Sequence, residues 1–164
     1  MVATIPVPVQ FSLPEGWRSV PPDQVDAGEA AFVALRPPGT KGFTPNITIS
    51  GDLHDTSEPI TAIADAAVER LRRGAPDVEI GKRKESGSAE NPGLTQTVRL
   101  TLRLNDQPEQ LVQLQVFIGM RDQRDPGRYA VLEIVLSSLA EQFPDVVGDF
   151  QQFVSTIKPE EAAS

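Results

Sequence analysis

The chain has 164 residues and no cysteine, which excludes disulfide bonds, thiol catalysis and cysteine-based metal sites. Its 15 basic and 23 acidic side chains give a net charge of -8, and such a surface argues against nucleic-acid binding because it repels phosphate. Apolar residues make up 39% of the sequence, enough for a core, but no stretch approaches the ~18 apolar residues of a membrane-spanning helix. We expect one domain over residues 1–158 and a disordered acidic tail over residues 159–164.

The first third of the chain predicts short strands separated by turns rich in proline and glycine. Strands are expected at residues 10–13, 30–36 and 46–50, and the Pro- and Asp-rich residues 19–29 predict a loop. The single tryptophan, Trp17, follows a Pro-Glu-Gly turn. We expect it to close one end of the core, because a large aromatic ring contributes most when it is buried.

An amphipathic helix is expected next, with apolar residues spaced at one helical face over residues 60–71. Either Ser57 or Thr56 is expected to cap it, Pro59 suits its first turn, and Gly74 marks its end. A weak strand at residues 77–85 follows. A second apolar helical stripe, residues 143–157, predicts a helix near the C-terminus.

Three strands are expected between these helices, at residues 94–104, 108–118 and 129–137. Most even-numbered positions in them are apolar, whereas the odd positions of the first strand are threonine and arginine. Period-two alternation is typical of a strand with one buried face. The pattern therefore predicts an α+β domain in which a twisted, mainly antiparallel sheet packs both helices on its even-numbered face.

The same alternation constrains the hairpin after residue 104. Even residues face even residues only if the paired numbers add up to an even value, which a two-residue turn does not allow. We therefore expect a loop of three or five residues around Asn105 and Asp106, two residue types that tolerate left-handed backbone.

The order of elements resembles the Mog1/PsbP-like fold. FSLPEGW at residues 11–17 is similar to that group's opening strand and turn, and GFTPNITI at residues 42–49 is similar to its aromatic and asparagine entry into a strand. Within the group, the chain is most similar to the small actinobacterial LpqN-type proteins. The resemblance implies an antiparallel sheet packed by helices, and an accessory or binding role such as that of PsbP at photosystem II or Mog1 with the GTPase Ran.

The odd-numbered sheet positions supply most of the candidate binding residues. The polar members are Arg99, Arg103, Gln113, Gln115 and Glu133; the apolar members are Leu111, Phe117, Val131 and Val135. One interpretation is a solvated face with cross-strand charge pairs. The other is a flat platform that docks a protein partner or a second copy of the chain, with the apolar part covered by a loop or another chain.

Two further loops carry candidate binding residues. The charged segment after the second long strand contains Arg121 and Arg124, and loops on rigid sheets often carry binding residues. Phe43 and Asn46 stand at the entry to an earlier strand, where Asn46 is expected to bond local backbone or else to contact a ligand.

Catalytic chemistry has little support in the sequence. The only histidine, His54, has Asp52, Asp55 and Glu58 nearby, which fits turn capping better than a metal or acid–base cluster. We find no nucleophile elbow, phosphate loop or dinucleotide motif, and expect no catalytic, metal or cofactor site.

Two functions stay open at this stage. The first is a non-enzymatic accessory or binding protein that engages a protein partner. The second is a carrier of a small ligand, with a pocket between sheet and helices near Trp17 and Phe43.

The N-terminus bears on localisation. It lacks the basic segment and the continuous apolar run of a secretory signal, and no lipid-anchoring cysteine is present. The sequence as it stands predicts a cytoplasmic protein, and a processed form of an exported precursor is the alternative.

Overall fold

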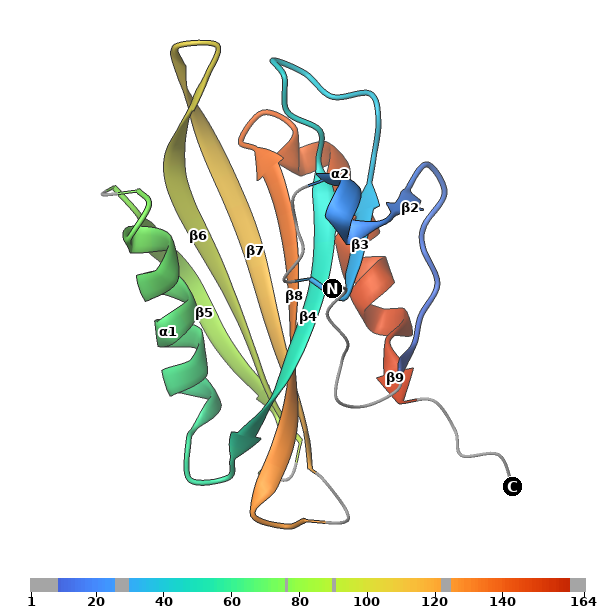
Figure 1. Cartoon of the computed structure of the whole chain (residues 1–164), viewed down its shortest axis with the longest axis vertical. Coiled ribbons are helices and arrows are strands. Elements are labelled where there is room, and N and C mark those ends of the chain that lie inside the picture. Colours follow the sequence, from blue (N-terminus) through green and yellow to red (C-terminus); the bar gives the residue numbers. More distant parts are fainter. Residues whose placement is uncertain (1–8, 26–29, 76, 90, 122–124, 160–164) are drawn as a thin grey trace.

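The structure, a computed structural model, describes residues 9–25, 30–75, 77–89, 91–121 and 125–159 (Figure 1). The elements are β1 Val9–Gln10, β2 Arg18–Val20, the short 3-10 helix η1 Pro22–Val25, β3 Phe32–Leu35, β4 Asn46–Asp55, α1 Ile60–Arg72, β5 Glu79–Gly87, β6 Pro92–Leu104, β7 Gln107–Arg121, β8 Arg128–Leu139, α2 Phe143–Thr156 and β9 Lys158–Pro159. None of the helices formed by these residues is long and apolar enough to cross a membrane.

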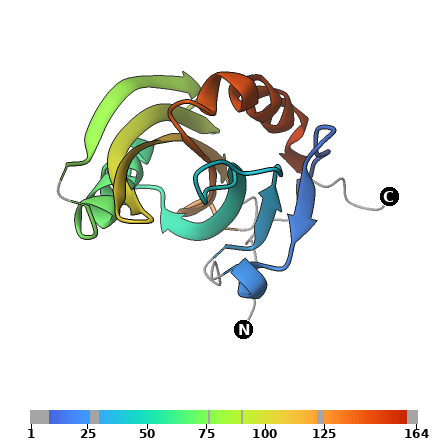
Figure 2. The ribbon, with the colours of Figure 1, turned by 90° about the horizontal axis from the view of Figure 1, so that it is seen from above.

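Seven strands form one antiparallel sheet in the order β2-β3-β4-β8-β7-β6-β5. The long strands β4, β8, β7 and β6 occupy its middle, and β5 forms one edge. Seen from above, the sheet is strongly curved (Figure 2). The small pair β1 and β9 joins the two ends of the described chain, because Val9 lies opposite Pro159. Residues 160–164 of the predicted tail lie outside the described residues, and Pro159 belongs to a strand.

The β6–β7 hairpin has a two-residue turn, so the predicted loop of three or five residues is wrong. Leu104 lies opposite Gln107, and the turn residues Asn105 and Asp106 have φ of 52° and 63°. Positive φ at both positions is typical of the type I′ turn, whose twist matches that of the flanking strands. Even residues of β6 therefore share a face with odd residues of β7, as where Leu100 lies opposite Leu111.

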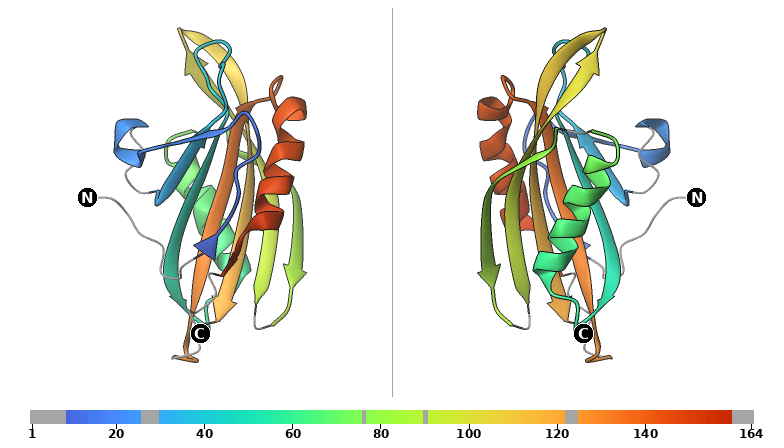
Figure 3. Two further views of the ribbon diagram at one scale, coloured as in Figure 1. Left: turned by 90° about the vertical axis from the view of Figure 1, so that its right-hand side faces the viewer. Right: turned by 90° about the vertical axis from the view of Figure 1, so that its left-hand side faces the viewer.

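This register places the helices on opposite faces of the sheet, and the prediction that both cover one face is also wrong. Ile63 and Ala67 of α1 pack in one cluster with Phe117 and Val131. Phe150 of α2 packs in a separate cluster on the other face. Figure 3 shows the two helices on different sides of the strands.

Three of the apolar odd-numbered residues, Leu111, Phe117 and Val131, therefore pack with residues of α1, which supplies the cover that was expected from a loop or another chain. Leu111, Phe117, Val131 and Val135 are all buried. Between residues 129 and 136, strand β8 has apolar residues at both odd and even positions, with the exception of Glu133. Such a run is typical of a central strand that is covered on both faces.

The N-terminal elements also differ in part from the prediction. Strand β2 lies where a loop was expected, and β4 runs five residues further than expected, to Asp55. Neither Ser57 nor Thr56 caps α1, whose N-cap residue is Pro59 without a side-chain hydrogen bond. The prediction for Trp17 is confirmed: its ring is buried beside α2, and its Nε1 donates a hydrogen bond of 3.0 Å to Asp149.

Candidate functional site

Two of the predicted platform residues belong to a hydrogen-bonded chain beneath α1. Gln115 is buried and donates to Oε1 of Gln113 at 3.0 Å, and Gln113 donates to Oγ of Ser137 at 3.2 Å. Gln96, also buried, donates to Gln115 at 2.8 Å and to the carbonyl of Ala64 in α1 at 3.2 Å. These amides hold the helix to the sheet, and their mutual hydrogen bonds compensate for their burial.

Glu133 lies on the same face, at the margin of α1. Its carboxylate accepts a hydrogen bond from Nη2 of Arg70 at 3.1 Å, and 23% of its side chain is exposed. Burial raises the pKa of Glu133 above its ordinary value, and the nearby Arg70 opposes that rise. Glu133 is thus engaged by the protein's own helix.

The arginines of the predicted platform lie on the opposite face, so a single platform does not exist. Arg99 is exposed on β6 and is on the α2 side of the sheet. Arg103 donates to the backbone carbonyl of Asp106 in the hairpin turn at 3.2 Å. Arg121 is exposed at the end of β7, and Arg124 lies outside the described residues.

Phe43 and Asn46 make contacts within the fold. Phe43 is half-buried against the cluster that includes Val68 of α1, and its carbonyl accepts a hydrogen bond from Gln142 at 3.0 Å. Asn46 donates to the carbonyl of Thr44 at 3.1 Å, which confirms the expected local backbone bond. Because Trp17 packs with α2 on the other face, one pocket cannot include both Trp17 and Phe43.

A different group of side chains meets at the N-terminal end of α1. The full length of β4 places His54 opposite Tyr129 of β8. Nδ1 of His54 lies 2.9 Å from a carboxylate oxygen of Glu58, and the Tyr129 hydroxyl donates to the backbone carbonyl of Glu58. The turn before the helix is closed by Asp55, whose carboxylate accepts from the Ser57 amide at 2.8 Å. This hydrogen bond lowers the pKa of Asp55.

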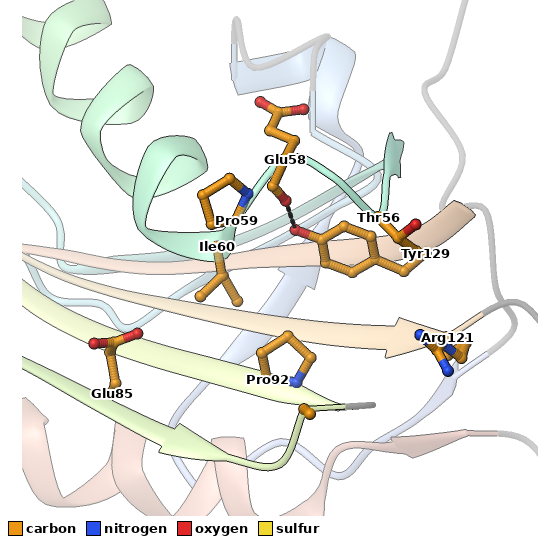
Figure 4. A pocket seen from close by; sticks show the side chains of 9 residues that line it. Thr56, Glu58, Pro59, Ile60, Glu85, Pro92, Arg121 and Tyr129 are labelled. Atoms are coloured by element: carbon orange, nitrogen blue, oxygen red, sulfur yellow. Dashed lines mark hydrogen bonds between the residues drawn. The ribbon is translucent and has the colours of Figure 1, made fainter. Parts of the chain in front are cut away.

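Two hollows flank Glu58. The first, which we call the Tyr129 hollow, has a volume of about 260 Å³ and lies between the start of α1 and the ends of β6 and β7. Figure 4 shows its lining. The residues are Thr56, Glu58, Pro59, Ile60, Glu85, Ala89, Pro92, Arg121 and Tyr129. Burial and the nearby Glu58 carboxylate raise the pKa of Tyr129, so its phenol is neutral around pH 7.

The second hollow, the His54 hollow, has a volume of about 320 Å³ and lies between α1 and β4. Its lining comprises Ser50, Gly51, Asp52, His54, Glu58, Ile63, Ala66 and Arg70. The two hollows together are called the α1 cleft below. No group of three or more metal-ligating side chains occurs among the residues that the structure describes. The linings of the α1 cleft offer polar and apolar contacts to a bound molecule.

The sequence did not predict the α1 cleft, although His54, Asp52 and Glu58 were considered together and Arg121 was a candidate binding residue. One signal was available. The alternation of Ile47 and Ile49 with polar residues continues through Gly51 and Leu53, which predicts a strand that reaches His54. The partner residue Tyr129 carried no local signal, because its place opposite His54 depends on strand pairing.

Comparison with known proteins reveals similarity of structure only. No family model matches the chain, and no curated protein matches its sequence. The structure of LpqN, described as involved in cell envelope biogenesis of Mycobacterium tuberculosis, matches with a TM-score of 0.64 at 13% identity, over 94% of this chain and 86% of that one. Cyanobacterial PsbP from Synechocystis matches with a TM-score of 0.60 at 12% identity, over 93% and 86%. The Ran-binding protein Mog1p of Saccharomyces cerevisiae matches with a TM-score of 0.54 at 12% identity, over 92% and 89%.

These similarities show the fold. The chain has the Mog1/PsbP-like fold, an α+β architecture of a seven-stranded antiparallel sheet and two helices. The expected resemblance is therefore confirmed at the level of the fold.

Proposed function

We propose that this protein is a non-enzymatic accessory protein that binds a protein partner through the α1 cleft. The observation that carries the proposal is the convergence of two hollows on Glu58, beside a long ladder of paired strands. Ten residue pairs between β4 and β8 form a continuous antiparallel ladder, and this ladder fixes the strand that lines one side of the cleft. Rigid walls favour binding because little order has to be created when a partner docks.

The fold supports a binding role without naming the partner. Among proteins with this fold, Mog1p is described as Ran-binding and LpqN as involved in cell envelope biogenesis. One fold commonly carries unrelated binding sites, so we assign neither role to this chain.

A small-ligand carrier is the second candidate, and it receives less support. Pockets for small molecules are typically enclosed, mostly apolar and about 300–1,000 Å³ in volume. The two hollows are at the lower end of that range or below it. Their linings include the charged residues Asp52, Glu58, Arg70 and Glu85, which suits a protein surface better than an apolar ligand.

The free edge of β5 is also less suited to a partner. The strand is irregular between Ile80 and Arg83, and Lys82 and Lys84 are exposed on it. Bulges and lysines are features by which edge strands avoid pairing with another chain.

Site-specific photocrosslinking in cells of the source organism tests the proposal. A photoreactive amino acid at Ala66 probes the His54 hollow, and one at Ala89 probes the Tyr129 hollow; both positions are exposed. The matched control places the same amino acid at the exposed Gln151 of α2. We expect one protein to crosslink from both cleft positions and not from Gln151.

Two outcomes overturn the proposal. The first is crosslinking that is equal from Gln151 and from the cleft positions. The second is loss of the crosslinked protein in the double variant Arg99→Glu/Arg103→Glu, which alters only the α2 side of the sheet and its hairpin.

A further inference from the structure

The lining of the Tyr129 hollow fits an apolar side chain of a partner. Ile60 and Tyr129 are largely buried beside Pro59 and Pro92. The hydroxyl of Tyr129 is already bound to the Glu58 carbonyl, so the ring presents its apolar surface to the hollow (Figure 4). Neither proline has a backbone N–H to offer. The floor formed by the side chains of these four residues therefore offers no free donor and favours apolar contact, whereas Glu58, Glu85 and Arg121 add charged groups to the lining (Figure 4).

Close packing fixes this floor. A β-carbon on Gly119 would lie 2.9 Å from Cγ of Pro92 and 3.1 Å from Cδ2 of Tyr129. Only glycine allows these two rings to approach the strand so closely. The apolar floor is thus part of the packed structure.

The His54 hollow has an excess of negative charge. Arg70 is paired with Glu133 at 3.1 Å, and Glu58 contacts the imidazole of His54 at 2.9 Å. Within the described part of the chain, neither Asp52 nor Glu58 forms an ion pair with a lysine or an arginine. The net charge of the whole chain is also negative, at -8, and such a protein attracts cations.

We propose that the α1 cleft binds a basic segment of a protein partner, with an apolar side chain in the Tyr129 hollow and a neighbouring lysine or arginine in the His54 hollow. The inference rests on the proposed function and adds the chemistry of the partner. The two hollows share Glu58 in their linings, so side chains of one short segment reach both. The cation meets Asp52 and Glu58, and the apolar group covers Tyr129.

Selection of peptides tests the inference without knowledge of the natural partner. The full chain is immobilised and a random-peptide library displayed on phage is selected against it. We expect the enriched peptides to place lysine or arginine within a few residues of a large apolar residue. On titration with such a peptide, the NMR amide signals of His54, Ile60 and Gly119 should shift, and those of α2 should not.

Charge variants supply the second part of the test. The double variant Asp52→Asn/Glu58→Gln should bind the selected peptides with an affinity that is lower by about tenfold or more, as expected when close charge partners are lost. Ser50→Lys adds a cation to the same hollow and should lower the affinity for these peptides in the same way. It retains Asp52 and Glu58, so it tests the charge effect even if the first variant folds poorly. Glu69→Gln removes a carboxylate on the exposed face of α1, and should bind as the wild type does.

The outcomes separate this inference from the function on which it rests. The inference of a basic segment is overturned if the enriched peptides lack basic residues. It is also overturned if the peptides bind Asp52→Asn/Glu58→Gln as tightly as the wild type. Neither result changes the crosslinking expected at Ala66 and Ala89, which tests the proposed function. Spermidine that binds as tightly as the best peptide also overturns the inference, because a small polycation would then suffice. NMR shifts confined to other surfaces overturn it as well.

Discussion

Gln96 of β6 donates a hydrogen bond of 2.8 Å to Gln115 of β7, and both side chains are buried beneath α1. Arg83 donates to Gln96 at 2.9 Å and pairs with Asp65 of α1 at 2.7 Å. Gln115 donates onward to Gln113. A polar chain therefore crosses the sheet under a helix, where an apolar layer would be the usual packing, and its hydrogen bonds fix how α1 lies on the strands.

Removing both members of this pair should cost less stability than the sum of the two single removals. We expect Gln115→Leu to lower the free energy of unfolding by about 1–3 kcal/mol, because Gln113 loses its donor and Gln96 loses one acceptor in a buried layer. In Gln96→Leu/Gln115→Leu neither amide remains, so the loss should be smaller than the sum of the two single losses. Urea unfolding of the four proteins of this cycle measures the difference. Strict additivity would show that the two amides do not depend on each other.

The β6–β7 turn should become more stable with glycine. Asp106 has a φ of 63°, a conformation that favours glycine over residues with a β-carbon. We expect Asp106→Gly to raise the free energy of unfolding by about 0.5–1 kcal/mol, and Asp106→Val to lower it by about 1–2 kcal/mol. Thermal unfolding of both variants is the measurement. A loss of stability in Asp106→Gly would contradict the two-residue turn.

Glu133 should make stability fall as the pH rises. Burial raises the pKa of Glu133 in the folded state, and Arg70 only partly opposes this. The folded chain therefore holds the proton more tightly than the unfolded chain, and stability declines from the ordinary glutamate pKa upward through the folded-state pKa. Glu133→Gln should be more stable than the wild type at neutral pH. The two proteins should converge below about pH 4.

Chemical unfolding at a series of pH values checks this prediction, with Glu69→Gln as control. Glu69 is exposed on α1 and pairs with Arg72, so its replacement should leave the pH profile unchanged. A wild-type profile that is parallel to that of Glu133→Gln over the whole range would contradict the buried state of Glu133.

Tyr129 should ionise above the usual range. It is the only tyrosine of the chain, so the ultraviolet absorbance change in alkaline solution reports this group alone. Burial first and the Glu58 carboxylate second raise its pKa, and the midpoint of the folded protein should exceed the value of about 10 for the unfolded chain. Stability should therefore fall as the pH rises above about 10.

Replacing Glu58 separates the two causes of this shift. In Glu58→Gln the backbone carbonyl that accepts from Tyr129 remains, but the nearby charge is gone. The pKa of Tyr129 should move down towards its ordinary value without reaching it, because burial persists. An unchanged midpoint would mean that the Glu58 charge does not act on the phenol.

Local patterns in the sequence determined most of the secondary structure. The spacing of Ile60 and Ile63 in the first helical stripe and of Phe150 and Phe153 in the second follows the helical period, which depends on the local backbone alone. The alternation after residue 94 likewise predicts strands. Trp17 was predicted to be buried because its size makes burial favourable wherever it lies.

Tertiary structure decided which face each residue occupies. The turn at Asn105 and Asp106 shifts the pairing by one residue, and one residue of shift moves every side chain of a strand to the other face. Gln115, predicted on an open platform, is therefore buried under α1. The apolar residues at both parities of β8 indicated a doubly covered strand, but only the packing of the helices showed which helix covers each side.

The α1 cleft depends on tertiary structure in the same way. His54 and Glu58 are four residues apart, and the turn between β4 and α1 brings their side chains into contact. Tyr129 and Pro92 come from β8 and β6, and no local pattern relates either residue to the start of α1. The sequence by itself determined both helices and the long strands β6, β7 and β8. The hollows exist only because the strand order and the register bring these distant residues to one end of the sheet.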